Sequence, residues 1–340
     1  MGISSPRNHT PVEQPDNQLN PRRAFVAILV VGVAIALVVA PSAWAGRPTS
    51  TTPPPVEQRT VGLAVAGAPT DLSEVLALQT KTGADIDQVT FYAAWAKGGD
   101  FPPADASRIA AAGAVPELTW EPWDPSGGTS QPAYALDRIT AGDHDAYLAR
   151  WAKQIKTWGK PLVLRFAHEM NGGWYPWAAG TNGNTADDYV AAWRHVVDVF
   201  RRAKVTNVTW SWSVNVPYAG STPLASLYPG DTYVGRVGLD GYNWGTTQPW
   251  SSWQSFGDIF GPGVAELDSL STRPVHVTET AAPENGGGDK AAWISDMWAW
   301  LDAHPEVRGV TWFSLLKEAD WRVDSSDASL NAWAAGARTF

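Results

Sequence analysis

The sequence comprises 340 residues, enough for one large domain or two small ones, each with its own core. Its net charge of −9 argues against a nucleic-acid partner, because phosphate binding needs a basic face. The absence of cysteine excludes disulfides, iron–sulfur clusters and thiolate zinc sites, and with them a redox role.

The first 59 residues carry signals for export rather than for a folded domain. Residues 1–23 are polar and end in "NPRR", directly before an apolar segment, residues 24–45, that closes with the small-x-small pattern of a cleavage site. The motif "RRAFV" is similar to a twin-arginine export signal, and the alternative is a positive flank that orients a membrane anchor. A Pro/Thr-rich tether, residues 46–59, follows. Both interpretations place the rest of the chain outside the membrane, either anchored at the cell surface or secreted.

Residues 60–340 alternate short apolar runs with amphipathic segments. Two of these segments, Asp143–Gly159 and Thr185–Lys204, open with capping residues and space their apolar residues three or four apart, which predicts helices. Eight strand–helix units predict a single (β/α)8 TIM barrel. The alternative, a doubly wound open sheet, gains no support because no Gly-rich phosphate loop follows an early strand. The predicted strands are Val61–Ala66, Gln88–Trp95, Val115–Trp120, Pro161–Ala167, Val208–Val214, Val237–Tyr242, Val275–Thr280 and Val310–Leu315.

Acidic side chains lie where several predicted strands end, and a (β/α)8 barrel carries its reactive groups at those ends. They are Glu121 after the third strand, Glu169 after the fourth, Asp240 in the sixth and Glu279 in the seventh. Carboxyl groups that converge on one rim raise some of their pKa values, which suits acid–base chemistry.

Arg165 and His168 accompany Glu169 in the sequence. Because side chains alternate along a strand, Arg165 should point the same way as Glu169, where it could hold carboxylates ionised. The alternative for Arg165 is a structural ion pair beneath the rim. His168 could orient a carboxylate or a sugar hydroxyl, and its alternative is packing outside the barrel wall.

Metal-dependent and serine-dependent chemistry find little support. A zincin motif needs a second histidine three residues after Glu169, where the chain continues Met170-Asn171-Gly172. The six histidines include no other closely spaced pair, and no G-x-S-x-G elbow occurs. We therefore expect neither a cofactor nor a catalytic metal.

The two glutamates Glu169 and Glu279, with aromatic residues around them, form the pair that glycoside hydrolysis needs. One carboxylic acid protonates the leaving oxygen, and a second carboxylate attacks the anomeric carbon. The chain contains 20 tryptophans, whose flat apolar faces suit sugar rings as well as core packing. The aromatic residues expected to stack on successive sugars are Trp174, Tyr175, Trp177, Trp244 and Trp312.

The segment "RFAHEMNGGWYPWA" resembles the acid/base segment of glycoside hydrolase family 26, whose members are secreted (β/α)8 endo-β-glycanases that retain the anomeric configuration. "KEADWRVDSS", after the eighth strand, also resembles bacterial members. The resemblance implies that Glu169 is the acid/base and Glu279 the nucleophile. It further implies substrate contacts by His168, Trp174, Asp240, Tyr242 and Trp312, with Tyr242 hydrogen-bonded to the nucleophile. Glu121, Arg165 and Trp244 complete the predicted substrate-binding set.

One departure from this family bears on the substrate. The aromatic residue that mannan-cleaving members carry shortly after the nucleophile is not evident in "TAAPENGGG", residues 280–288. Mixed-linkage β-glucan therefore competes with β-mannan as the expected polysaccharide. A non-catalytic carbohydrate-binding barrel at the cell surface is the rival function, although the presence of both glutamates favours an enzyme. We expect a monomer that binds polysaccharide and no nucleic acid.

Overall fold

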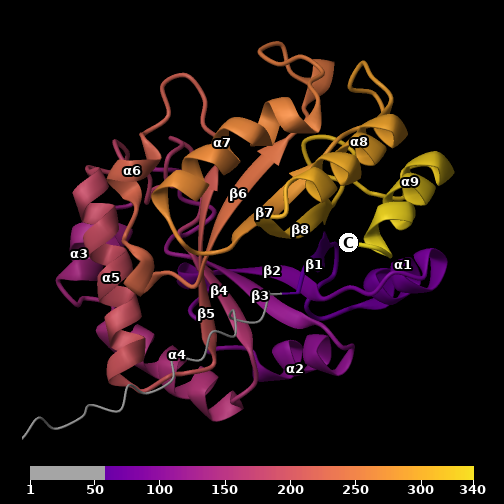
Figure 1. The fold of residues 1–340 in the computed structure, drawn as a ribbon. Helices are drawn as coiled ribbons and strands as arrows, with labels where there is room; N and C mark the ends of the chain where they lie inside the picture. Colours follow the sequence, from indigo (N-terminus) through magenta and orange to yellow (C-terminus); the bar gives the residue numbers. More distant parts are fainter. Residues whose placement is uncertain (1–57) are drawn as a thin grey trace, which may run out of the picture. The chain divides into compact units, whose positions relative to one another are not determined.

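The computed structural model describes residues 58–340, in which eight parallel strands form one closed barrel (Figure 1). Each strand pairs with the next along the chain, and β1 pairs with β8 to close the sheet, with Thr60 opposite Gly309 and Val65 opposite Ser314. This closure confirms the predicted (β/α)8 barrel, and the open-sheet alternative is wrong. The strands are β1 Thr60–Val65, β2 Gln88–Ala94, β3 Val115–Glu121, β4 Leu162–Phe166, β5 Val208–Asn215, β6 Arg236–Tyr242, β7 Val275–Ala281 and β8 Val307–Ser314.

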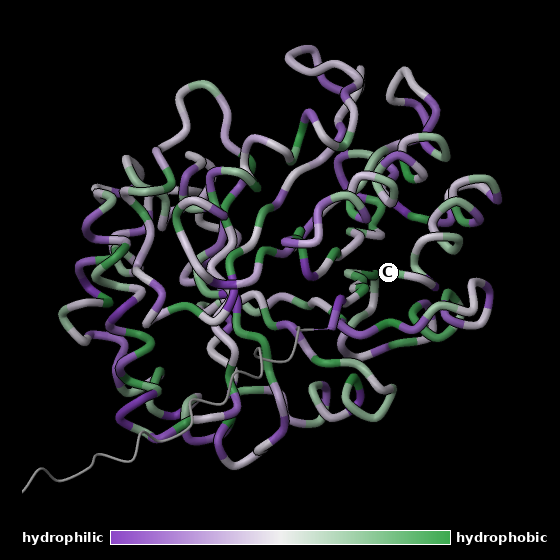
Figure 2. The backbone as a smooth tube through the Cα atoms, in the orientation of Figure 1, coloured by the Kyte–Doolittle hydropathy of each residue, from purple (hydrophilic) through white to green (hydrophobic). Residues whose placement is uncertain are grey.

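Helices follow the strands and surround the barrel (Figure 1). Hydrophilic and hydrophobic residues alternate along α4 and α5, as expected for helices with one buried side (Figure 2). The two helices predicted from capping and periodicity are confirmed as α4 and α5. The helices are α1 Ser73–Thr82, α2 Pro103–Ala111, α3 Leu136–Thr140, α4 Asp145–Trp158, α5 Ala186–Arg202, α6 Leu224–Leu227, α7 Phe256–Leu270, α8 Lys290–Ala303 and α9 Asp327–Ala337, with 3₁₀ turns at Trp95–Lys97, Pro132–Tyr134, Asp231–Tyr233 and Gly245–Thr247.

Helix α5 braces β4, the strand that leads into the predicted site. Its N-terminus is a capping box, in which the backbone N–H of Asp188 donates to the Thr185 hydroxyl at 3.1 Å and the backbone N–H of Thr185 donates to the Asp188 carboxylate at 2.8 Å. The buried side of α5 includes Trp193, whose ring lies 5.9 Å from that of Phe166 on β4. The end of β4 is therefore supported from outside the barrel.

Strand boundaries differ from the prediction at two informative places. The eighth strand was predicted to begin at Val310, but β8 begins at Val307. Gly309 lies within β8 and allows it to pass His276, since a Cβ at Gly309 would lie 2.2 Å from Nδ1 of His276. β4 ends at Phe166, one residue before the predicted end.

A buried polar layer fills the barrel near the N-terminal ends of the strands. Arg236 donates to Glu117, to Oε1 of Gln88 at 2.7 Å and to Oγ of Ser211 at 3.1 Å. These four side chains come from β6, β3, β2 and β5, and all are buried. A buried ion pair costs desolvation, and the additional hydrogen bonds offset that cost. A second ion-pair cluster lies nearer the C-terminal ends, in the candidate site.

The predicted N-terminal segments, residues 1–23, 24–45 and nearly all of 46–59, lie outside the described residues. Among the helices of residues 58–340, none is both long and apolar enough to cross a membrane.

Candidate active site

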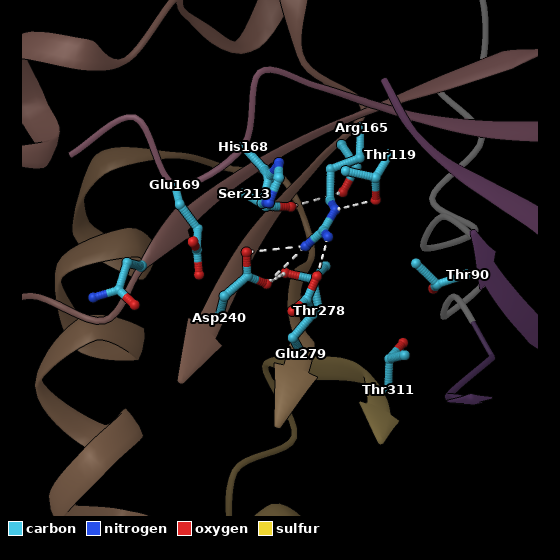
Figure 3. Close-up of polar contacts among 12 residues, drawn as sticks. Thr90, Thr119, Arg165, His168, Glu169, Ser213, Asp240, Thr278, Glu279 and Thr311 are labelled. Atoms are coloured by element: carbon cyan, nitrogen blue, oxygen red, sulfur yellow. Dashed lines mark hydrogen bonds and ion pairs between the residues drawn. The ribbon is translucent and has the colours of Figure 1, made fainter. Parts of the chain in front are cut away.

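Side chains from several strands meet around the guanidinium group of Arg165, which is fully buried on β4 (Figure 3). Its Nε donates to Oγ1 of Thr119 at 2.9 Å, and its Nη1 donates to both carboxylate oxygens of Asp240 at 2.9 Å. Its Nη2 donates to Oε1 of Glu279. One buried cation therefore fixes two carboxylates, from β6 and β7, by charge-assisted hydrogen bonds.

An irregularity in β7 lets two consecutive residues reach this cluster. The register between β7 and β8 shifts between Val277 and Thr280, whereas neighbours in a regular strand point to opposite faces. Glu279 bonds to Arg165, and Oγ1 of its neighbour Thr278 donates to Oδ1 of Asp240 at 2.6 Å. Both side chains thus help to hold the Arg165 cluster together.

The carboxylate of Glu279 accepts hydrogen bonds on both oxygens. The Tyr92 hydroxyl donates to Oε1 at 2.8 Å, beside the bond from Arg165, and the Tyr242 hydroxyl donates to Oε2. Burial alone would raise the pKa of Glu279, but the positive charge of Arg165 and these hydrogen bonds outweigh burial and hold that pKa below its usual value. Glu279 is therefore ionised at neutral pH.

Glu169 stands on a turn rather than on a strand. Beyond Phe166 the backbone enters the left-handed region at Ala167, with φ 46°, and again at Glu169, with φ 53°. Residues other than glycine rarely adopt this conformation, and it concentrates at functional sites. The backbone N–H of Glu169 donates to the Ser213 carbonyl at 2.9 Å, which fastens the turn to β5. Glu169 lies beyond the end of β4, so the alternation of side chains along that strand, which the sequence-based prediction used, does not set its direction relative to Arg165.

The carboxyl group of Glu169 is buried, with the residue only 8% exposed, and it accepts a hydrogen bond from Nε1 of Trp174 at 2.7 Å. Burial, and after it the negative charge of Glu279, raises the pKa of Glu169 to about 7. The Trp174 donation and the charge of Arg165 oppose this rise without cancelling it. The two glutamates therefore have pKa values shifted in opposite directions, which separates an acid from a base.

Three further predicted site residues lie near the two glutamates. His168 is buried against Tyr175, with ring centroids 4.8 Å apart, and burial holds the pKa of His168 well below its usual value, so its imidazole is neutral. Burial also raises the pKa of Glu121, at the end of β3, to about 7. Trp244 lies with its ring 6.0 Å from that of Tyr242.

Trp312 does not belong to this site, contrary to the sequence-based prediction. The residue is only 1% exposed, its ring packs 6.2 Å from that of Trp293 of α8, and its Nε1 donates to the Trp321 carbonyl at 2.8 Å. The neighbouring Thr311 faces the barrel interior, so alternation along β8 turns Trp312 outward. Trp177 is also fully buried and cannot offer a stacking face.

Three residues at this end of the barrel were not predicted. Tyr92 of β2 bonds to Glu279, and Phe313 of β8 lies 5.6 Å from the ring of Tyr242. Tyr218, in the segment after β5, is 46% exposed and stacks on Trp174, with centroids 6.1 Å apart. Strand parity would have found Tyr92 and Phe313, whereas no sequence pattern marks Tyr218.

The possible metal ligands of residues 58–340 are dispersed. That part of the chain contains no group of three or more His, Cys, Asp or Glu side chains placed to hold a metal ion. The cluster around Arg165 instead balances its carboxylates with a guanidinium group.

The chain is similar to several known proteins. Residues 75–268 match the model of glycosyl hydrolase family 26. Endoglucanase H of Acetivibrio thermocellus is 37% identical over 278 residues, which are 80% of this chain and 30% of that protein. A mannan endo-1,4-β-mannosidase of Bacillus subtilis is 28% identical over 148 residues, 42% of this chain and 37% of that protein. This chain therefore spans less than half the length of either relative.

Solved structures share the fold. A family 26 β-mannanase from Bacteroides ovatus superposes with a TM-score of 0.61 at 15% identity, covering 84% of this chain and 89% of that one. The catalytic domain of an endo-β-1,4-mannanase from Bacillus sp. JAMB-750 gives a TM-score of 0.61 at 19% identity, covering 81% and 85%.

Proposed function

Because the chain belongs to glycosyl hydrolase family 26, we propose that it is an endo-β-glycanase that hydrolyses β-1,4-linked polysaccharide with retention of anomeric configuration. In this proposal Glu169 is the acid/base and Glu279 the nucleophile. The observation that carries it is the contrast between the surroundings of the two buried glutamates. Glu279 accepts hydrogen bonds from Arg165 and two tyrosines, which hold its pKa below the usual value, whereas Glu169 is buried with one donor and its pKa is raised to about 7. A barrel that only binds sugars has no need to divide its carboxyl groups in this way.

The first chemical step uses both groups in the states that their surroundings favour. Ionised Glu279, held by Arg165 and two tyrosines, attacks the anomeric carbon as the glycosidic bond breaks. Protonated Glu169 gives its proton to the departing oxygen. Loss of that proton leaves Glu169 ionised and ready for the second step.

The second step releases the sugar. Ionised Glu169 takes a proton from water while the water oxygen attacks the anomeric carbon, and the bond to Glu279 breaks. Glu279 returns as a carboxylate, which Arg165 stabilises. Two inversions at one carbon restore the original configuration.

We propose glucan with mixed linkages as the first substrate to test and β-mannan as the second. The similarity to endoglucanase H extends over 278 residues, whereas a mannan endo-1,4-β-mannosidase of Bifidobacterium adolescentis is 35% identical over only 85 residues. The segment after Glu279, residues 280–288, also lacks the aromatic residue of the mannan-cleaving pattern.

The test measures reducing sugar released from mixed-linkage β-glucan, β-mannan and other β-glycans. Glu279→Ala should abolish turnover, and added azide should partly restore it by forming a glycosyl azide of inverted configuration. Glu169→Ala should spare the first step of substrates with activated leaving groups and stall at the glycosyl-enzyme. Glu266→Ala on α7 is the matched control, since its side chain makes none of the contacts described above. Proton NMR that found the inverted anomer as first product would overturn Glu279 as nucleophile, and no release from any β-glycan would favour the binding protein.

A further inference from the structure

Tyr92 combines two properties that set it apart from the other residues around Glu279. Its hydroxyl donates to Oε1 of Glu279 at 2.8 Å, while the residue as a whole stays 38% exposed. The guanidinium carbon of Arg165 lies 5.9 Å from the centre of the Tyr92 ring. The ring therefore borders the site, and the hydroxyl reaches the carboxylate in its interior.

The two oxygens of Glu279 are not equally occupied. Oε1 accepts two hydrogen bonds, from Tyr92 and from Nη2 of Arg165. Oε2 accepts one, from Tyr242. A carboxylate oxygen offers two lone-pair positions, so both positions on Oε1 are taken and one on Oε2 remains open.

A nucleophile needs a free lone pair to form its new bond. This inference rests on the proposed function: we propose that Tyr92 is a positioning residue that occupies Oε1 together with Arg165 and thereby directs the attack on the anomeric carbon through Oε2 of Glu279.

The electron balance of both steps is consistent with this role. In the first step a lone pair on Oε2 forms the bond to the anomeric carbon, the glycosidic bond breaks, and the leaving oxygen takes the proton of Glu169. Oε1 then becomes the carbonyl oxygen of an ester and keeps both donors. In the second step the bond from Oε2 breaks, its electron pair returns to the carboxylate, and Tyr92 and Arg165 stabilise the returning charge on Oε1.

The test replaces Tyr92 by phenylalanine, which keeps the ring and removes only the hydroxyl. We expect kcat/KM to fall about ten- to a hundredfold, the effect of removing one hydrogen bond to a charged group. The fall should also appear with aryl glycosides that carry activated leaving groups, because both kinds of substrate need Glu279 as nucleophile, whereas only the polymer depends strongly on the proton from Glu169. The acidic limb of the pH profile should move upward, because the ionised form of Glu279 loses a donor.

Tyr228→Phe is the matched control, since its hydroxyl also donates to a carboxylate, that of Asp231, but away from the site. The acidic limb of the pH profile of Tyr228→Phe should coincide with that of the wild type, even if the melting temperature of the variant falls. Tyr92→Phe with wild-type or faster turnover would mean that freeing Oε1 does no harm, and would overturn the assignment of Oε2. A fall in thermal stability alone, with an unmoved acidic limb, would reduce Tyr92 to a structural role.

A second readout separates this inference from the proposed function. Carbon-13 NMR of labelled glutamate follows the titration of Glu279 without substrate, and the resonance is assigned by its loss in Glu279→Gln. The pKa of Glu279 should rise in Tyr92→Phe and stay unchanged in Tyr228→Phe. If the wild-type protein cleaved no β-glycan, the proposed function would fail, and an unmoved Glu279 titration in Tyr92→Phe would overturn the role of Tyr92 by itself.

Discussion

The indole of Trp174 donates to Glu169, the proposed acid/base, and replacing it by phenylalanine tests the effect of that contact. Nε1 of Trp174 donates to Oε2 of Glu169 at 2.7 Å and thereby favours the ionised form of Glu169. Phenylalanine keeps an aromatic ring and removes the donor. The pKa of Glu169, already raised to about 7, should therefore rise further.

The size of the change follows from the contact. A hydrogen bond to a charged group contributes about 1.5–3 kcal/mol, and because Trp174 is 42% exposed we use about 1 kcal/mol. That energy corresponds to a rise of about 0.7 in the pKa of Glu169. Since the proposed first step needs protonated Glu169, the alkaline limb of the activity profile should move upward by a similar amount.

Gly172→Ala tests the same contact without altering the indole. A Cβ at Gly172 would lie 2.3 Å from the Trp174 ring, so the indole must move away and lose its bond to Glu169. Trp244→Phe is the control, because its ring borders Tyr242 rather than Glu169. The assay is kcat/KM on a soluble substrate from acid to alkaline pH. An alkaline limb that stays in place, or moves downward, in Trp174→Phe would refute this reasoning.

The other predictions concern stability and export. Arg165→Met leaves Asp240 and Glu279 buried without their cation, so the free energy of unfolding in urea should fall by about 3–5 kcal/mol at neutral pH. The pKa of Glu279 is lower in the folded protein than in the unfolded chain, so the ion pair with Arg165 stabilises the fold fully above the unfolded-state pKa. This stabilisation is lost as the pH falls through the folded-state pKa. The difference in unfolding free energy between wild type and variant should therefore shrink in acid. A loss below about 1 kcal/mol at neutral pH would contradict the buried pair. Replacing Arg22 and Arg23 by lysine should abolish appearance of the domain outside the cell, as measured by fractionation, and unchanged export would leave only the general secretory or anchor interpretation.

The sequence predicted the barrel and its principal carboxyl groups because both depend on local patterns. Apolar runs set the strands, and Glu169 and Glu279 occur where those runs end. Trp312 was placed wrongly because a resemblance in residue type was followed without strand parity, which turns Phe313 rather than Trp312 toward the site. Tyr92 was missed for the same reason, since parity along β2 places its side chain on the inward face that Thr90 also occupies.

Two local features could not be predicted from pattern at all. The left-handed backbone of Glu169 depends on its bond to Ser213, and the register shift in β7 depends on the neighbouring strand. Each is set by tertiary contacts that no short window of sequence contains. The pKa values depend on the same contacts, so the sequence could mark Glu169 as a candidate acid but could not predict its raised pKa.

Closure of the barrel has a consequence for how the chain folds. The pairing of β1 with β8 joins the first strand of the domain to the last, so the sheet cannot close until the end of the chain is available. Contacts of such long sequence separation slow folding, because the entropy of closing the intervening loop is lost before the contacts form. Until β8 docks, β1 and β7 each present an unpaired edge, and open edges invite pairing between chains. A growing chain therefore stays vulnerable to aggregation until its last strand emerges from the ribosome, and any chaperone that assists this domain must act over that interval.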